Sequence, residues 1–428
     1  MTAPAAIVES APGTGSRRVL FVLLIAYIFN FIDRQIIGVL AVPIKPELQL
    51  SDTQLSLMGG IAFALFYSGI AIPVAWLADR KSRVNIIAFS VALWSAFTAV
   101  CGLAQNFWHL FFARMGVGIG EAGGVAPSYA LISDFFPKQQ RARALAIFSL
   151  GIPIGSALGV FFGGWIASNL DWRSAFLIVG LAGLPVALAV KLTIKEPRRG
   201  AFDSPDGATS PPAPPLLDVA KTLARKPSFW LLSFGAASGS IVGYGWIFWL
   251  PSFFSRSFGL ELAEVSWYYG SIILVGGVAG TLLGGWFGDW IGVRKPGAYA
   301  LIPAVSFVIA APIFALGLFG SSLTIAWLLF VIGQMLALAW LGPVIAAVQQ
   351  IVPPNMRATA SASMLFINNL IGIGFGIFFL GFMSDRMNAA YGTDALRYSM
   401  LYGLGFYLLS AALFLGAARW LKRDWHNG

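Results

Sequence analysis

The 428-residue sequence has a single cysteine, Cys101, and two histidines, His109 and His426. One cysteine excludes an internal disulfide and any metal site built from several cysteines. The two histidines fall at the edge of an apolar run and in the C-terminal tail, so they supply neither a catalytic dyad nor a metal cluster. The sequence therefore predicts no metal, no cofactor and no enzyme active site.

Charge is also scarce, because charged residues make up 11% of the chain and hydrophobic residues 58%. The mean hydropathy of +0.78 leaves too little polar surface for a soluble protein of this size. The net charge of +10 would suit nucleic acid, but in so apolar a chain it is better explained by the basic cytoplasmic loops of membrane proteins. We expect an integral membrane protein with no nucleic-acid partner.

Apolar runs long enough to cross a bilayer, which takes roughly 20 residues, recur along the whole chain. They lie near residues 18–41, 54–78, 84–105, 108–132, 144–168, 173–194, 229–253, 264–288, 297–319, 322–350, 358–383 and 396–420. The first run is longer than a signal-peptide core and has no cleavage site, so we expect it to be retained as the first helix. The sequence predicts an all-α membrane protein of twelve transmembrane helices.

The distribution of Lys and Arg sets the predicted orientation. With the N-terminus in the cytoplasm, about 20 of these residues fall in cytoplasmic segments. Only five fall outside, and these are Lys45, Arg173, Arg256, Arg386 and Arg397. The imbalance predicts a multi-pass protein of the bacterial inner membrane with both termini in the cytoplasm.

The twelve runs form two sets of six, separated by residues 195–228. This break carries seven prolines and ends in the amphipathic stretch LLDVAKTLARK, which predicts a flexible cytoplasmic linker with one interfacial helix. Residues 1–194 and 229–428 are predicted to form two pseudo-symmetric six-helix bundles. Two such bundles facing each other across a cavity are what alternating access requires.

The two halves are also related in sequence. Gly60 and Asp79 correspond to Gly270 and Asp289 at an offset of 210 residues, which indicates a duplicated six-helix unit. Asp79 opens the segment DRKSR, which ends at Arg83, and Asp289 ends the segment GWFGD. Both segments resemble the cytoplasmic loop signature GxxxDRxGRR of the major facilitator superfamily. The resemblance implies a transporter whose cytoplasmic gate is closed by Asp79, Arg83 and Asp289, with acidic residues at helix N-termini.

Three motifs in the N-terminal half narrow the resemblance. They are NFIDR at residues 30–34, RMGVGIGEA at 114–122 and GIPIGSALG at 151–159. Together they resemble the spinster branch of the superfamily, whose animal members export lysolipids. The resemblance implies proton-linked transport centred on the acids of the first and fourth helices, Asp33 and Glu121.

Four charged residues lie well inside the predicted spans: Asp33, Arg34, Arg114 and Glu121. A charge at bilayer depth costs roughly 2.5–3.5 kcal/mol on insertion scales, so such residues are rare and functional. With a rise of about 1.5 Å per residue, Asp33 and Arg114 are predicted at one depth and Glu121 two turns deeper. We expect a vertical ladder of Asp33, Arg114 and Glu121, with Arg34 about 100° around the helix.

The acids in this ladder are predicted to carry protons, and the arginines to pair with them and to bind a substrate anion. A carboxylate loses its proton more easily beside an arginine, so a rearranging arginine would switch its proton affinity. The sequence leaves one alternative open, a fixed buried salt bridge that specifies the packing of the bundle.

The C-terminal half has no interior charge and offers amides and aromatic rings instead. With Asn30 of the first helix, the candidate cavity residues are Tyr244, Trp246, Gln334, Trp340, Asn368 and Asn369. Such groups suit the uncharged part of a substrate, and each can also serve as a contact between helices.

These features predict a monomeric, proton-coupled secondary transporter that moves an amphipathic or anionic organic solute, such as a lysolipid-like molecule, by alternating access. Its expected partners are that substrate, protons and membrane lipids. The main alternative is a carrier of a small hydrophilic organic anion. A passive scramblase or a transporter-fold sensor is a more distant one.

Overall fold

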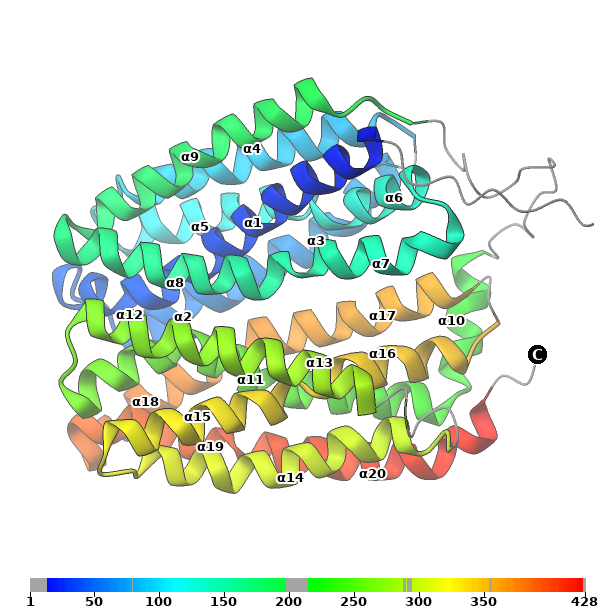
Figure 1. Ribbon diagram of the computed structural model, residues 1–428. Coiled ribbons are helices and arrows are strands. Elements are labelled where there is room, and N and C mark those ends of the chain that lie inside the picture. Colours follow the sequence, from blue (N-terminus) through cyan, green and yellow to red (C-terminus); the bar gives the residue numbers. More distant parts are fainter. Residues whose placement is uncertain are drawn as a thin grey trace, which may run out of the picture.

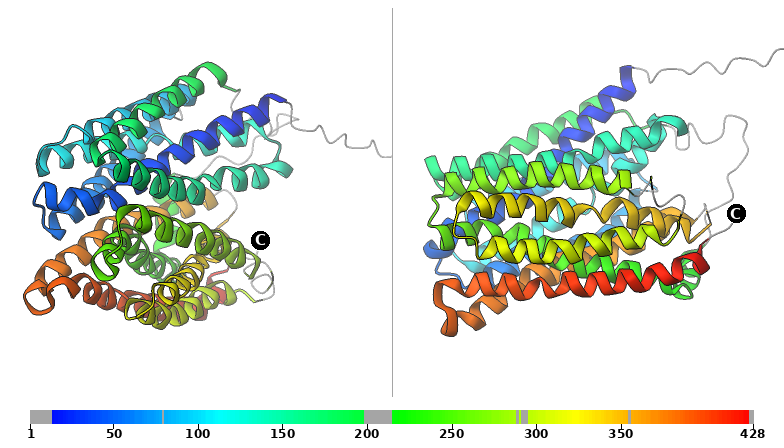
Figure 2. Two further views of the ribbon diagram at one scale, coloured as in Figure 1. Left: turned by 60° about the vertical axis from the view of Figure 1, so that its left-hand side comes forward. Right: turned by 60° about the horizontal axis from the view of Figure 1, so that its bottom comes forward.

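The computed structural model describes residues 14–78, 80–197, 215–287, 290, 295–353 and 356–425. These residues are helical nearly throughout, and no strand occurs among them. They form two groups of six passes that lie side by side (Figures 1 and 2). The predicted all-α fold of two six-helix bundles is confirmed.

The first bundle contains three undivided and three divided passes. In chain order they are α1 (Thr14–Glu47); α2 (Asp52–Ser56), η1 (Leu57–Ile61) and α3 (Ala62–Ala78); α4 (Arg83–Cys101); α5 (Phe107–Glu121) and α6 (Val125–Phe135); α7 (Lys138–Ser149) and α8 (Gly151–Asn169); and α9 (Trp172–Thr193). The short helix α10 (Leu216–Ala224) follows where the linker helix was predicted.

The second bundle repeats this plan with more divided passes. They are α11 (Pro227–Phe258); α12 (Leu262–Ser271), η2 (Ile272–Gly276) and α13 (Gly277–Phe287); α14 (Ala298–Leu318); α15 (Leu323–Leu338) and α16 (Leu341–Gln350); α17 (Arg357–Asn369), η5 (Leu370–Phe375) and α18 (Gly376–Tyr391); and, after η6 (Gly392–Asp394), α19 (Ala395–Gly403) and α20 (Gly405–Asp424).

Among the described residues, ten helical stretches are long and apolar enough to span a bilayer. The stretch Thr359–Asp424 contains two passes, and the pass formed by α5 and α6 is interrupted at residues 122–124, so the total is twelve. Large apolar side chains face outward, with Phe21 62% exposed and Leu192 72% exposed. An exterior of this kind suits lipid rather than water.

Both ends of the described chain lie at one end of the molecule (Figure 1), which we call the terminal end. The opposite end, where α1 is followed by α2, is the distal end. The bundles approach each other closely through glycines in the distal half. A Cβ atom on Gly38 of α1 would lie 3.4 Å from the Phe248 backbone of α11, and one on Gly381 would lie 2.5 Å from the main-chain oxygen of Asp52. Contact without side chains lets the bundles close tightly here.

Candidate functional site

The centre of the site is an ion pair between the first and fourth passes. The Arg34 Nη2 atom lies 2.6 Å from Glu121 Oε2, and Arg34 Nε donates to the same oxygen at 3.2 Å. Glu121 is fully buried, whereas the Arg34 side chain is 13% exposed. The pair therefore sits at the inner edge of the N-terminal bundle, with its arginine toward the second bundle.

Aromatic rings surround this arginine. The Arg34 guanidinium lies 5.0 Å from the ring centre of Phe31, 4.9 Å from Phe63 and 5.0 Å from Tyr67. Cation–π attraction of this kind strengthens when the groups are removed from water. The rings hold the guanidinium in place without neutralising it.

Asp33 and Arg114 form the second part of the site. Arg114 Nη1 donates to the main-chain oxygen of Asp33 at 3.3 Å, and the two residues are 0% and 1% exposed. Neither carboxylate oxygen of Asp33 has a hydrogen-bond partner within the described structure. This site thus contains one paired acid, Glu121, and one buried acid without a bound donor, Asp33.

This pairing differs from the predicted ladder of Asp33, Arg114 and Glu121, which left Arg34 to one side. Helical side chains lean toward the N-terminus of their own helix. Arg34 on α1 therefore reaches back toward the terminal end, to the depth of Glu121. Arg114, on the oppositely directed α5, leans toward the distal end and meets the Asp33 carbonyl instead. Arg34 is the ion-pair partner, and the depth estimate missed it because it ignored side-chain direction.

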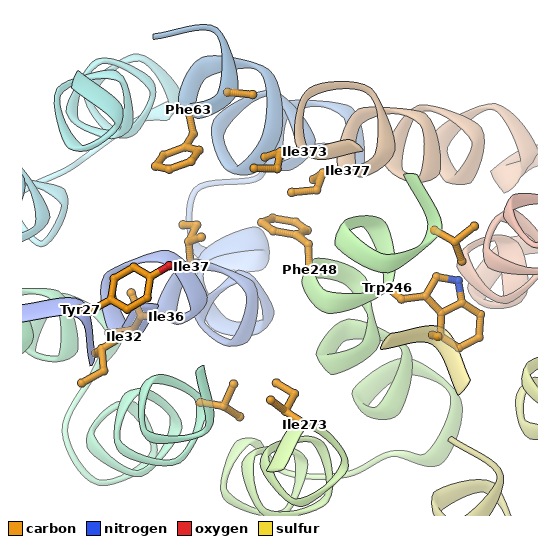
Figure 3. Packing of buried hydrophobic residues seen from close by; sticks show 14 of the residues in the cluster. Tyr27, Ile32, Ile36, Ile37, Phe63, Trp246, Phe248, Ile273, Ile373 and Ile377 are labelled. Atoms are coloured by element: carbon orange, nitrogen blue, oxygen red, sulfur yellow. The ribbon is translucent and has the colours of Figure 1, made fainter. Parts of the chain in front are cut away.

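A small pocket lies between the bundles beside this pair. It is lined by Arg34, Gln35 and Gly38 of α1; Gly59 and Phe63 of the second pass; Tyr244, Ile247 and Phe248 of α11; and Ile373 and Ile377 of the eleventh pass. Figure 3 shows Phe248 directed toward the first bundle, near Ile37, Ile373 and Ile377. Among these lining residues Arg34 alone is charged, so the pocket is an apolar cleft with one cation.

Several predicted cavity residues gather near the pocket. Tyr244 lines it, and its hydroxyl lies 3.5 Å from Asn369 Oδ1. Asn368 donates to the same oxygen at 3.3 Å and accepts from Ser240 at 2.7 Å. Asn30 is buried beside Glu121. Tyr244 therefore faces the pocket, while Asn368 and Asn369 hold α11 and α17 together behind it.

Three other predicted cavity residues lie elsewhere. Trp246 is 3% exposed and packs on Phe314 at a ring distance of 4.4 Å, and Figure 3 shows it pointing away from the first bundle. Gln334 packs against Gly276, and Trp340 is buried just before α16. Tyr244 and Trp246 are two residues apart on a helix and so face different sides.

At the terminal end, Arg83 binds one acid of α6 and one acid in the segment that follows α9. Its Nη1 atom lies 2.6 Å from Asp134 and its Nε atom 2.8 Å from Glu196. Glu196 also accepts from the Val84 amide and the Ser82 hydroxyl. Partial burial raises the pKa of Glu196, but these donors outweigh it and hold the pKa below its usual value. The other predicted gating residues, Asp79 and Asp289, lie outside the described residues.

A charge cluster that the sequence did not predict joins the two bundles at the distal end. Asp52, 2% exposed at the start of α2, accepts from Lys45 Nζ at 2.6 Å. It also accepts from both Arg256 Nη atoms of α11, at 2.7 and 2.6 Å, and from the Ser384 hydroxyl of α18 at 2.7 Å. We call these four residues the distal latch, because two of them belong to each bundle.

Asp385 extends the contact. It accepts the amides of Asp52 and Thr53 at 3.1 and 2.7 Å and the Thr53 hydroxyl at 2.6 Å. A carboxylate from the second bundle therefore caps the N-terminus of a helix in the first. The partners are more than 200 residues apart in sequence, so spacing gave no signal. The capping box formed by Ser51 and Gln54 was the only local sign of a fixed helix start.

Two helical bundles of six passes, with buried charges facing a cleft between them, define a membrane transporter. The model of the Major Facilitator Superfamily matches residues 23–377 of this chain. The chain belongs to this superfamily, as its loop motifs predicted, and it is a transporter rather than an enzyme.

The similar proteins place it in the spinster-like branch. An MFS-type efflux pump of Mycolicibacterium smegmatis is 33% identical, with 99% of each chain covered. Protein spinster homolog 1 of Mus musculus is 29% identical over 95% of this chain and 81% of the mouse protein. The predicted branch is confirmed.

Solved structures agree with this placement. A bacterial homolog of the human lysosomal transporter spinster, in an inward-facing and unoccupied conformation, matches with a TM-score of 0.86 at 33% identity. This match covers 97% of this chain and all of that one. Its inward-facing and occupied form matches with a TM-score of 0.85, and this match covers 98% of this chain and 99% of that one. A mutant form of the nucleoside transporter NupG, at 13% identity and a TM-score of 0.72, shares the fold.

Proposed function

We propose that this protein is a proton-coupled secondary transporter that moves an amphipathic or anionic organic solute by alternating access. The observation that carries the proposal is the pairing of Glu121 with Arg34 beside the pocket, next to a second buried acid, Asp33. When Glu121 binds a proton, its attraction to Arg34 falls, and the arginine becomes free to bind an anion. Protonation of Glu121 and binding of the substrate would then be linked through the Arg34 side chain.

The lining of the pocket favours an amphipathic substrate. The polar lining is one cation, one amide and one phenol, from Arg34, Gln35 and Tyr244. Apolar residues such as Phe63 and Phe248 form the rest of the walls. An anionic head group would bind at Arg34 while an apolar portion contacts the walls. A lysolipid-like molecule has this chemistry, whereas a small hydrophilic anion, the competing candidate, would leave the apolar walls unused.

The proposed orientation in the membrane follows from the distribution of Lys and Arg residues and from the contact that closes the distal end. The terminal end carries most of the Lys and Arg residues in the sequence, so we place it, with both chain termini, in the cytoplasm of a bacterial cell. The distal latch then closes the outer face of the inner membrane. In this assignment the conformation is inward-facing, and Asp79, Arg83 and Asp289 belong to the cytoplasmic gate. We further propose that the protein acts as a monomer.

Spin-label distances between the bundles test the coupling. Labels at Leu103 and Ser321, in distal loops of the two bundles, should report a distance distribution that changes between about pH 4.5 and 8. Asp33→Asn and Glu121→Gln, combined, should abolish this change. Glu47→Gln is the matched control, because Glu47 is a partly exposed acid of α1 bound to Arg173, and it should retain the response. A full pH response in the double variant would refute the proposal.

A thermal-shift screen tests the substrate class. A bound ligand stabilises the folded state by mass action, so lysolipids should raise the unfolding temperature of wild type and fail to do so in Arg34→Gln. Stabilisation by small organic acids alone would favour the hydrophilic-anion carrier.

A further inference from the structure

The helix α4, which forms the third pass, also faces Asp33. The fourth pass is therefore not the only wall of the site. Trp94 and Thr98, one turn apart on α4, are 1% and 0% exposed and adjoin the Asp33 carboxylate. The Trp94 Nε1 and Thr98 Oγ1 atoms have no hydrogen-bond partner within the described structure. The two carboxylate oxygens of Asp33 also have none. Two buried donors without a hydrogen bond therefore adjoin a buried acceptor that also has none.

The packing around α4 fixes these donors in place. A Cβ atom on Gly120 of α5 would lie 2.6 Å from the Trp94 backbone nitrogen, and one on Gly124 would lie 3.2 Å from the Trp94 ring. On the opposite side, a Cβ atom on Gly180 of α9 would lie 2.7 Å from the Ser95 carbonyl oxygen. Helices in such close contact hold their side chains rigidly. Gly120 of the RMGVGIGEA motif and Gly124 after it thus let α4, which carries the donors, pack closely against the fourth pass.

Buried polar groups in proteins are nearly always hydrogen-bonded, so each exception calls for an explanation. We infer that Trp94 and Thr98 are positioning residues for Asp33, donating hydrogen bonds to its carboxylate when the proton leaves. In this proposal the Asp33 carboxylate turns toward the two α4 donors, which the packing holds beside it. The inference rests on the proposed proton coupling and adds α4 to the elements that carry it.

Other ionisable groups near Asp33 do not supply these bonds. Glu121 is an acid bound to Arg34, and Arg114 donates to the Asp33 main chain. The Cys101 thiol, buried at the end of α4, is a weak donor. Within the described parts of α8 and α9, charged side chains occur only at Arg173 and Lys191, near the two ends of α9. Trp94 and Thr98 are neutral donors from another helix that adjoin the carboxylate.

The test compares Thr98→Val, which removes the donor and nearly conserves the shape, with Trp94→Phe, which removes the indole N–H together with one ring. A donor to the charged form favours release of the proton. The midpoint of the pH-dependent distance change between labels at Leu103 and Ser321 should therefore move to higher pH in each variant. The expected shift is about one pH unit, the size of one hydrogen bond to a charged group. Thr98→Ser should keep the wild-type midpoint, because it retains the hydroxyl.

Ser95→Ala is the matched control. Ser95 is equally buried on α4 and its hydroxyl also has no partner in the described structure, but it faces Gly183 of α9. It should leave the midpoint unchanged. Unchanged midpoints in both Thr98→Val and Trp94→Phe, or an equal shift in Ser95→Ala, would overturn the inference. Asp33→Asn in the same assay distinguishes a failure of this inference from a failure of the proposed function. If the pH response persists in Asp33→Asn, proton coupling at Asp33 is refuted. If Asp33→Asn loses the response but the α4 variants behave as wild type, proton coupling stands without Trp94 and Thr98.

Discussion

The two bundles share one plan of six passes but differ in what fills them. The interior of the first holds buried ions, with Glu121 bound to Arg34 and Asp33 beside Arg114. The second is filled with rings: Trp246 packs on Phe314 and Phe330, and Phe307 stacks on Tyr407 at 4.6 Å. Ions can exchange partners, whereas interlocked rings have one good arrangement. In the proposed mechanism the first bundle senses protons, and the second serves as the rigid body against which it moves.

Breaking the ion pair should have the largest effect. Arg34→Gln leaves the fully buried Glu121 without its partner, which should cost about 3–5 kcal/mol of stability and abolish transport. Adding Glu121→Gln removes the orphaned charge, so the double variant should regain most of the stability without regaining transport. Thermal unfolding and a proton-driven uptake assay measure the two effects separately.

Asp33→Asn is the contrasting variant within the same bundle. Because the Asp33 carboxylate has no bound donor to lose, thermal stability should stay near wild type while the pH response is lost. A stability loss as large as that of Arg34→Gln would mean that both acids are structural.

The corresponding change in the second bundle should affect stability alone. Phe314 is 2% exposed and contacts both Trp246 and Phe330. Phe314→Ala should cost about 3–5 kcal/mol, as large-to-small core changes do. The folded fraction should keep the wild-type pH midpoint in the spin-label assay. A shifted midpoint would contradict the division of roles, because it would place proton sensing in the ring-filled bundle as well.

A smaller effect is expected where the bundles meet. Asp52→Asn removes the charge that binds Lys45 and Arg256 but leaves each bundle intact. The outward-open population should rise about tenfold or more, since 1.4 kcal/mol already changes a two-state ratio tenfold. Labels at Leu103 and Ser321 should report longer distances at every pH. Asp394→Asn, whose partner Arg397 lies in the same bundle, is the control and should leave the distances unchanged.

Much of this architecture could be predicted from the sequence, because hydropathy and charge bias act along the chain. The positions of Asp33, Arg34, Arg114 and Glu121 followed from the cost of charge in lipid. Their pairing did not, since it depends on helix direction and side-chain reach. The distal latch was also missed: Lys45 and Arg256 counted only as topology markers, and nothing local links Asp52 to Arg256 or Ser384. Trp246 was misplaced because composition does not tell which side of a helix faces the cleft.

The smallest expected effect is at Glu196, where the terminal end of the first bundle is tied together. Glu196 binds Arg83, the Val84 amide and Ser82, and its pKa lies below its usual value. A carboxylate whose pKa is lowered by folding stabilises the protein at pH values above its pKa in the unfolded state. This stabilisation is lost as the pH falls through the folded-state pKa. Glu196→Gln should therefore cost about 0.5–1 kcal/mol at neutral pH, discounted for partial exposure. The difference in unfolding free energy between Glu196→Gln and wild type should shrink below the ordinary glutamate pKa of about 4.3.

The control is Asp218→Asn, because Asp218 is an exposed acid at the same end. It should show no such convergence. Thermal unfolding of the three proteins from pH 3.5 to 7 measures this, and a constant gap between Glu196→Gln and wild type would show that Glu196 acts by shape rather than by charge.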